Sequence, residues 1–305
     1  MNNPRELFFN RVYDMVKNGE DIMIVTSDLA GPSLDNYRQD FPEHYLSVGI
    51  AEQSQISTSC GLALGGKKVI AWGVNPFIVT RALDQIRNTV SLMNIPIVFL
   101  GLQAGLSGAI LGPSHVALTD LSLIRTCENI TTYNPSDLGI CKDIFDDVLQ
   151  FNKPCYVRID NGVNYNIDRN GLNVNDGFSK IRDGRDLLVL TTGYHVNICA
   201  DVVDSLNSDI ALIDVFKFPC NKSALAEEIK KYKKIITIEE HLLQGGFGSF
   251  VLEIMADHEI VLPVKRAGID SEKGCYEFYG DRKFFNEHFG LDKDGLTSFI
   301  KKWHL

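Results

Sequence analysis

Residues 68–100 read KVIAWGVNPFIVTRALDQIRNTVSLMNIPIVFL, and this stretch decides the fold class. Residues 68–72 form a short apolar run of the kind found in buried strands. Residues 77–93 have helical length, and residues 95–100 form a second apolar run. Short apolar strands separated by helices predict a parallel sheet that is covered by helices on both faces.

The same alternation continues on both sides of this unit. In the first part of the chain, further segments are predicted at residues 4–16 (helix), 21–26 (strand), 51–65 (helix), 118–127, 138–151 and 155–159 (strand). In the second part, strands are predicted at residues 187–191, 210–214 and 234–238, and helices near 195–206, 223–232 and 247–257. We therefore expect an α/β protein with two domains, each built on a parallel sheet.

A change in composition separates the two parts. Residues 161–186, NGVNYNIDRNGLNVNDGFSKIRDGRD, are crowded with Asn, Asp and Gly, which favour turns and connectors. This predicts a linker at residues 163–185 between a first domain at 1–162 and a smaller second domain at 186–305. A chain of 305 residues is long enough for two such domains.

The composition is that of a globular protein, with 45% hydrophobic and 23% charged residues. A net charge of −9 argues against nucleic acid or an anionic membrane surface as the main partner. The seven cysteines form no CxxC pair, so free thiols in a reducing compartment are expected rather than disulfides or a metal site. The first residues lack a signal-peptide pattern, and no apolar run reaches the roughly 18 residues of a membrane span. The sequence therefore predicts a cytoplasmic protein.

Glu52 is the first candidate for chemistry. It lies in SVGIAEQ, residues 47–53, which follows a short strand and opens a helix. A glutamate in a first helical turn is usually a surface residue, because the helix dipole favours an anion there. Here the neighbours Gly49 and Ile50 and the apolar residues that follow predict burial instead. A buried carboxylate without a partner has a raised pKa and can share a proton with a ring nitrogen.

His115 is the second candidate. It ends GPSH, residues 112–115, after a glycine-rich loop at residues 101–112. The apolar strand 95–100 delivers this loop to the carboxyl edge of the sheet, where ligands bind in open α/β folds. His115 could act as a general acid or base near neutral pH, although a single histidine in a loop more often makes structural hydrogen bonds.

Two further motifs carry weaker signals. TRALDQIR, residues 80–87, predicts an amphipathic helix with Arg81, Asp84 and Arg87 on its polar side. IEEHL, residues 238–242, is followed by GGFG at 245–248. Glycines between a strand and a helix can bind phosphate, but GGFG lacks the full dinucleotide fingerprint.

Taken in order, these motifs resemble the C-terminal half of transketolases. The resemblance extends from residue 27 to about residue 268 and includes IAEQ, RALDQIR, GPSH with LTDLSLIR, NPSD at 134–137, and EEH with GGFGS. It implies a pyrimidine-binding domain followed by a transketolase C-terminal domain. It also implies that Glu52 hydrogen-bonds N1′ of the aminopyrimidine of thiamine diphosphate, so that the cofactor loses its thiazolium proton and cleaves a carbon–carbon bond of a ketose. His115 matches a family histidine near the substrate.

Other site residues follow from the resemblance in the same way. Ile78 stands where the family has an aromatic residue on the pyrimidine, with Phe77 and Phe99 as local substitutes and Arg81 beside them. The residues matched to substrate contacts are Asp28, Ser33, Gln103, Leu111, Arg158 and Asn161.

Three of these substrate positions depart from the family. Leu111 replaces an aspartate, Gln103 a phosphate-binding histidine, and Asn161 an arginine. Charge-assisted phosphate contacts contribute more than neutral hydrogen bonds. The departures therefore predict a modified or nucleotide-linked sugar as substrate rather than the usual phosphorylated pentose.

The resemblance also implies a partner. The family has an N-terminal domain whose GDG…N motif holds magnesium and the diphosphate, and no Gly-Asp-Gly occurs in this sequence. A separate transketolase subunit would then supply this motif with its Mg²⁺ or Ca²⁺, leaving no metal site in this chain. An α2β2-type assembly is the natural expectation.

Two alternatives stand beside a ketol-transferring transketolase subunit. One is the β subunit of a 2-oxo acid dehydrogenase or of a deoxyxylulose phosphate synthase-like enzyme, which share the architecture. EEH and GPSH favour transketolase over the dehydrogenases. The other is a non-catalytic scaffold. The residues at positions 78 and 111 suit a scaffold, whereas retention of Glu52 and His115 opposes it.

Overall fold

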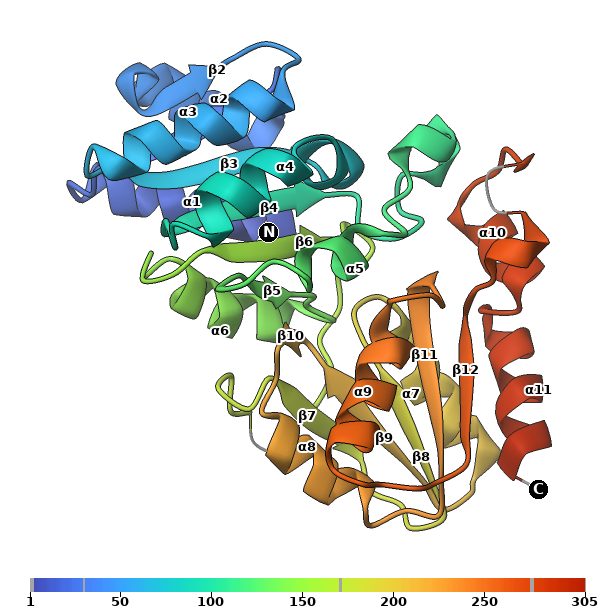
Figure 1. Cartoon of the computed structure of the whole chain (residues 1–305). Coiled ribbons are helices and arrows are strands. Elements are labelled where there is room, and N and C mark those ends of the chain that lie inside the picture. The colour runs from blue at the N-terminus through green and yellow to red at the C-terminus, as the bar shows by residue number, and fades with distance from the viewer. Residues whose placement is uncertain (1–2, 30, 170–171, 275–276, 305) are drawn as a thin grey trace.

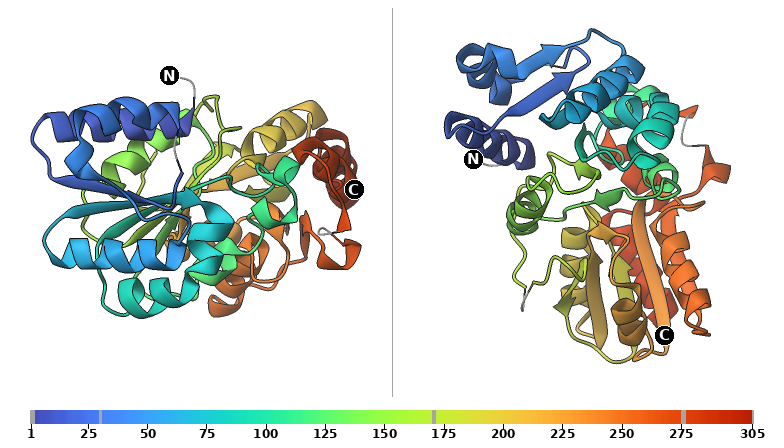
Figure 2. Two further views of the ribbon diagram at one scale, coloured as in Figure 1. Left: turned by 90° about the horizontal axis from the view of Figure 1, so that it is seen from above. Right: turned by 60° about the vertical axis from the view of Figure 1, so that its left-hand side comes forward.

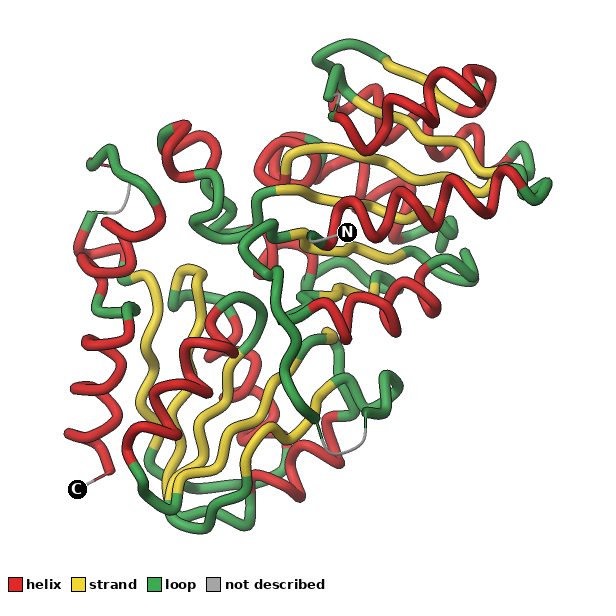
Figure 3. The backbone as a smooth tube through the Cα atoms, turned by 180° about the vertical axis from the view of Figure 1, so that it is seen from behind, coloured by secondary structure: helices red, strands yellow, loops and turns green. Residues whose placement is uncertain are grey.

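A computed structural model of the chain describes residues 3–29, 31–169, 172–274 and 277–304, except for the side chain of Ser33. It shows two α/β units, one above the other in Figure 1, with a separate set of strands in each (Figure 3). The predicted fold class is confirmed: both sheets are dominated by parallel strands.

In the described part of the chain, the first sheet has seven strands in the order β10-β5-β6-β4-β3-β1-β2. Neighbouring strands are parallel except for β10 and β5. The strands are β1 Ile22–Thr26, β2 Tyr45–Ser47, β3 Lys68–Val74, β4 Ile97–Leu102, β5 Thr131–Tyr133, β6 Cys155–Ile159 and β10 Lys217–Phe218.

Helices cover both faces of this sheet, as the sequence predicted. They are α1 Pro4–Lys17, α2 Pro32–Asp40, α3 Glu52–Leu64, α5 Asp120–Ile124 and α6 Leu138–Val148, together with a helical segment at 76–91. Alternate residues of β3 point to opposite sides: Ile70 and Trp72 belong to the core under α1 and α6, and Val69 and Ala71 to the core under α3. The left view of Figure 2 shows α1 and α3 on opposite faces.

The helix predicted at 77–93 has an unusual form. Wide π-helical turns at Pro76–Arg81 and Ile86–Ser91 flank the short α4, Leu83–Gln85. Such turns are often found at functional sites. The first of them carries both Phe77 and Arg81.

The second sheet has the order β12-β11-β8-β9-β7 in the described residues. Its strands are β7 Phe178–Arg182, β8 Leu187–Thr191, β9 Ile210–Val215, β11 Lys234–Leu242 and β12 Val264–Ile269. Its helices are α7 His195–Leu206, α8 Lys222–Ile229, α9 Phe247–Asp257, α10 Arg282–Phe289 and α11 Lys293–His304. The three strands predicted here are the three central ones.

The edge strand β7 lies inside the stretch predicted as a connector, and β12, α10 and α11 were not predicted. β7 is short and surrounded by turn-forming residues, and it pairs antiparallel with β9. Only this pairing makes the segment a strand, because its own sequence has no long apolar run.

The two units are joined by backbone as well as side chains. β10 follows β9 along the chain but pairs antiparallel with β5 of the first sheet. Asn134, just after β5, donates through Nδ2 to Thr192 Oγ1 of the second unit over 2.9 Å.

Six cysteines in the described residues are free and buried. None of the described helices combines the length and the apolar character needed to cross a membrane.

Candidate active site

The topology places a cleft where the strand order reverses. The chain runs from β1 to β2 on one side and then to β3 on the other side of β1. In open α/β sheets, ligands bind beyond the carboxyl ends of the strands at such a point. A cleft of about 320 Å³ lies there, between the ends of β1 and β3. It is lined by Ser27, Asp28, Leu29, Ile50, Glu52, Gly73, Val74, Phe77 and Arg81.

Glu52 lies in the wall of this cleft. It is the first residue of α3, and only 5% of its side chain is exposed. Two features of the sequence put it there: the short strand β2 ends at Ser47, and the glycine at position 49 turns the chain with a positive φ of 74°. The helix N-terminus favours the negative charge of the carboxylate.

Gln55, one turn after Glu52, fixes this helix to the sheet. Its Nε2 donates to the carbonyl oxygens of Val25 in β1 and Trp72 in β3, over 2.8 and 2.9 Å. Its Oε1 accepts from Ser27 Oγ over 2.7 Å. Gln55 therefore ties the carboxyl ends of both strands to the helix that carries Glu52.

The Glu52 carboxylate has a partner, contrary to the expectation of an unpaired buried acid. Arg81 Nη1 lies 2.6 Å from Glu52 Oε2. The Arg81 guanidinium also lies over the Phe77 ring, 4.5 Å from its centre. Arg81 thus leaves the polar face of its helix and turns into the cleft, where its charge compensates that of Glu52.

His115 reaches the same region from another loop. Its ring packs edge-on against Phe77 with 5.0 Å between ring centres. Ser114 Oγ lies 3.0 Å from His115 Nδ1. Phe77 therefore links the two predicted catalytic residues, because its ring contacts both His115 and Arg81, the partner of Glu52.

The other predicted cofactor contacts are less accessible. Ile78 and Phe99 have no exposed surface and belong to the core beneath α3. Of the three apolar candidates, Phe77 alone lines the cleft. Ile78 is held inward because Gly73 beside it has no side chain: a Cβ on Gly73 would lie 3.0 Å from the Cβ of Ile78.

The predicted substrate residues are spread over several places. Asp28 is exposed and lines the cleft, and Gln103 lies at the end of β4 with a buried, unpartnered Oε1 and a positive φ. Leu111 and Asn161 are exposed on loops outside the cleft lining. The side chain of Ser33 lies outside the described part of the structure.

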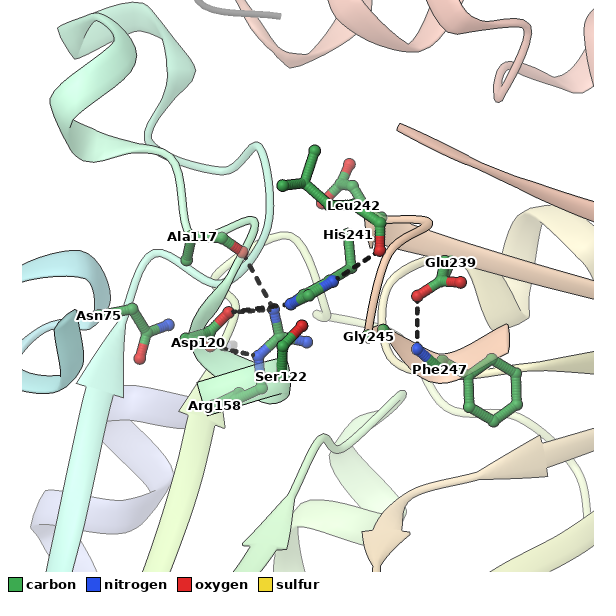
Figure 4. Close-up of polar contacts among 12 residues, drawn as sticks. Asn75, Ala117, Asp120, Ser122, Arg158, Glu239, His241, Leu242, Gly245 and Phe247 are labelled. Atoms are coloured by element: carbon green, nitrogen blue, oxygen red, sulfur yellow. Dashed lines mark hydrogen bonds and ion pairs between the residues drawn. The ribbon is translucent and has the colours of Figure 1, made fainter. Parts of the chain in front are cut away.

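Arg158 is not a free phosphate-binding group, because it is buried and paired with Asp120. Arg158 Nε lies 2.7 Å from Asp120 Oδ2, and the Tyr156 hydroxyl donates to the same oxygen over 2.6 Å. Burial by itself would raise the pKa of Asp120, but Arg158 and His241 lower it below the ordinary range. Figure 4 shows this cluster between the two units.

His241 is the second unit's contribution to this cluster. Its Nε2 lies 3.9 Å from Asp120 Oδ1, and burial lowers the pKa of the imidazole to about 4. The sequence pointed to EEH and to the residues around Asp120 as motifs but gave no reason to place them together.

The glycine-rich turn GGFG does not form an open phosphate site. Glu239 accepts from the backbone N–H groups of Phe247 and Gly248 over 2.5 and 2.8 Å, as Figure 4 shows for Phe247. The side chain therefore occupies the N-terminus of α9, where an anion would bind. Burial raises the pKa of Glu239 to about 8.

Comparison with known families divides the chain in the same way as the fold. Residues 3–163 match the family model "Transketolase, pyrimidine binding domain", and residues 178–293 match "Transketolase, C-terminal domain". Among solved structures, a chain described as "Split gene transketolase, inactive beta4 tetramer" has a TM-score of 0.84 at 22% identity and covers 99% of this chain and 98% of its own.

Curated relatives include two kinds of protein. One subunit of the apulose-4-phosphate transketolase of Actinobacillus succinogenes is 31% identical over 297 residues, which is 95% of each chain. The 1-deoxy-D-xylulose-5-phosphate synthase of Neisseria meningitidis is also 31% identical, over 90% of this chain but only 42% of the relative. The chain thus spans nearly all of the first relative and less than half of the second. It belongs to the transketolase family and is homologous to one subunit of the split transketolases.

Proposed function

We propose that this chain is the pyrimidine-binding subunit of a two-chain transketolase that uses thiamine diphosphate to transfer a two-carbon ketol unit between sugars. The observation that carries this proposal is the position of Glu52. Its carboxylate is buried in the cleft at the reversal of strand order, beside an aromatic ring, in a chain homologous to a split-transketolase subunit.

The residues of the cleft fit the aminopyrimidine part of the cofactor. Glu52 offers a sheltered acceptor whose Oε1 has no hydrogen-bond partner among the described residues, and Phe77 offers an apolar wall. The Glu52 carboxylate would hydrogen-bond to N1′ of the aminopyrimidine and stabilise a proton on that nitrogen. Phe77 would flank the pyrimidine ring. When bound, thiamine diphosphate supplies a carbon nucleophile and an electron sink for cleavage next to a carbonyl.

His115 has a separate part in this proposal. It contacts Phe77 but does not line the cleft that contains Glu52, so it would meet the reacting sugar rather than the pyrimidine. An imidazole in that place can move a proton to or from a substrate oxygen.

The partner subunit completes the site in this proposal. In the described residues, no group of three His, Cys, Asp or Glu side chains is arranged to hold a metal ion. A partner with the GDG…N motif would hold the diphosphate and Mg²⁺ or Ca²⁺, and two copies of each chain would form the enzyme. Free buried cysteines fit a reducing compartment such as the cytoplasm.

The substrate is proposed to be a modified or non-standard sugar. The neutral residues Gln103, Leu111 and Asn161, together with the occupied Arg158, leave few charged groups for a terminal phosphate. Two relatives are named for apulose 4-phosphate, which keeps a phosphorylated sugar among the candidates. Equal turnover of xylulose 5-phosphate and of unphosphorylated or nucleotide-linked ketoses would contradict the proposal that the substrate is a modified or non-standard sugar.

The test is Glu52→Gln in the complex assembled with the partner subunit. We expect turnover to fall by about 10² or more, since a neutral amide cannot take part in the proton transfer. Thiamine diphosphate binding, measured by calorimetry, identifies the cofactor independently of turnover. Glu6→Gln is a matched control, because Glu6 is also an acid in the first turn of a helix, α1.

Unchanged turnover in Glu52→Gln would overturn the proposal and favour a scaffold. Release of carbon dioxide from a 2-oxo acid, without ketol transfer between sugars, would favour the synthase-like alternative that the Neisseria relative represents.

A further inference from the structure

The loop that carries His115 buries its apolar side chains in the core of the second unit. We define the His115 loop as residues 104–118. Leu106, Ala109, Val116 and Leu118 of this loop are buried and belong to the hydrophobic core of the second sheet. The loop leaves β4 of the first sheet and projects toward α10 in Figure 1.

Two hydrogen bonds, one to a side chain and one between backbone groups, fix the ends of this loop to β11 of the second sheet. Near its start, the N–H of Leu106 donates to Glu240 Oε2 over 3.0 Å. At its end, the N–H of Leu242 donates to the carbonyl oxygen of Leu118 over 3.1 Å. Gly105 permits the first contact, since it has a positive φ of 58° and a Cβ there would overlap Glu240 Oε2.

Glu240 is held in place by a charge cluster that spans both units. Arg282 of α10 donates to Glu240 through Nε over 2.8 Å and to Asp160, after β6, through Nη1 over 3.0 Å. Burial would raise the pKa of Glu240, but Arg282 lowers it below the ordinary value. The Leu106 N–H therefore meets an ionised acceptor, which makes a stronger hydrogen bond than a neutral one.

The tip of the loop is more exposed than its ends. Ile110 and Leu111 are 71% and 54% exposed. His115 is half-buried and touches Phe77 of the first unit. The place of His115 relative to Phe77 thus depends on where the two ends of the loop are attached. Leu106 and Leu118 bind β11 of the second unit, next to bonds from Ala104 and Ala117 to β6 of the first.

We infer that Glu240, with Arg282 behind it, is a positioning residue: the second unit sets the place of His115 in the active site of the first by holding the ends of the His115 loop. This inference rests on the proposed function for its catalytic consequence. The attachment of the His115 loop concerns this chain alone. It can therefore be disproved without disproving the proposed function, and the reverse also holds.

The structural part is tested by hydrogen–deuterium exchange on the intact chain with Glu240→Ala. The fold should survive this change, because Arg282 keeps Asp160 as its partner. We expect amides of residues 104–118 to exchange at least about tenfold faster while β8 and β9 keep their protection. Glu228→Ala is the control: Glu228 is also an acid paired with a cation, Lys180, but it lies on α8, away from the loop. Unchanged exchange in the loop, or equal acceleration in the control, would overturn the inference.

The catalytic part is tested in the assembled enzyme by a double-mutant cycle. Glu240→Ala should lower kcat and leave the dissociation constant for thiamine diphosphate unchanged. The same change in a His115→Ala background should have no further effect on kcat, since the residue acts through His115. Glu240→Gln should recover part of the loss, because its amide oxygen can still accept from Leu106. Additive losses in the cycle would overturn the positioning role even where the exchange result stands, and absence of turnover in the unaltered enzyme would contradict the proposed function instead.

Discussion

Arg81 Nη1 lies 2.6 Å from Glu52 Oε2 while the same guanidinium covers the ring of Phe77. One side chain thus touches both the acid and the aromatic wall of the cleft. An ionised carboxylate at 5% exposure requires such compensation, because an unpaired charge at that depth loses its hydration. The contact with Arg81 therefore offsets the cost of burying the Glu52 carboxylate.

Arg81→Ala is expected to destabilise the chain through Glu52. Removing one partner of a part-buried pair leaves an uncompensated carboxylate, and the half-exposed position of Arg81 limits the cost to about 1–3 kcal/mol. Urea unfolding of the chain measures the loss. In the Glu52→Gln background the same change should cost much less, and Arg87→Ala, in the same helical segment but exposed, is the control. Equal losses in both backgrounds would show that the pair contributes nothing.

Gln55→Leu is expected to loosen the strand ends beneath the cleft. It leaves the carbonyl oxygens of Val25 and Trp72 without their side-chain donor. Buried groups that lose a hydrogen bond cost about 1–3 kcal/mol each, so the free energy of unfolding should fall by roughly 2–4 kcal/mol. Gln53→Leu, two residues away on the exposed side of α3, should change it by less than about 0.5 kcal/mol. A similar effect of both variants would contradict the role given to Gln55.

His241 should make the chain less stable as the solution becomes acidic. Burial lowers its pKa from 6.5 to about 4, so the folded state favours the neutral imidazole. This contribution is complete above pH 6.5 and is lost as the pH falls toward 4, by up to roughly 3 kcal/mol at 1.36 kcal/mol per pH unit. Unfolding measured from pH 7.5 to 4.5 should show the loss, and His241→Gln should reduce the slope. His258→Gln, at the end of α9, should leave it unchanged.

Glu239 should make the chain less stable as the solution becomes alkaline, which is the opposite of the effect of His241. Burial raises its pKa from 4.5 to about 8, so the folded state favours the protonated acid. Its contribution is complete below pH 4.5 and is lost as the pH rises toward 8, by up to about 5 kcal/mol. Glu239→Gln keeps one oxygen, which can accept from either the Phe247 or the Gly248 N–H group, and cannot ionise. Its unfolding free energy should therefore exceed that of the unaltered chain at pH 8 by more than at pH 5, and a constant difference between the two would count against the assignment.

The sequence by itself determined the fold class and the identity of the chemical groups. Runs such as residues 68–72 and 95–100 predict buried parallel strands, because apolar length and flanking helices are local properties. The motif around Glu52 and the motif that ends in His115 could also be recognised, because each is a short stretch of consecutive residues. The short edge strand β7 could not, since its strand character depends on its pairing with β9.

Only the tertiary structure decided which of these groups meet. Glu52 and Arg81 are 29 residues apart, and Leu106 and Glu240 are 134 apart. Their contacts follow from the order of strands in each sheet and from the way that the second unit packs on the first. Local sequence preferences depend on residues that are close along the chain. A buried charge instead pairs with a group that is close in space, and only the folded structure determines which group that is.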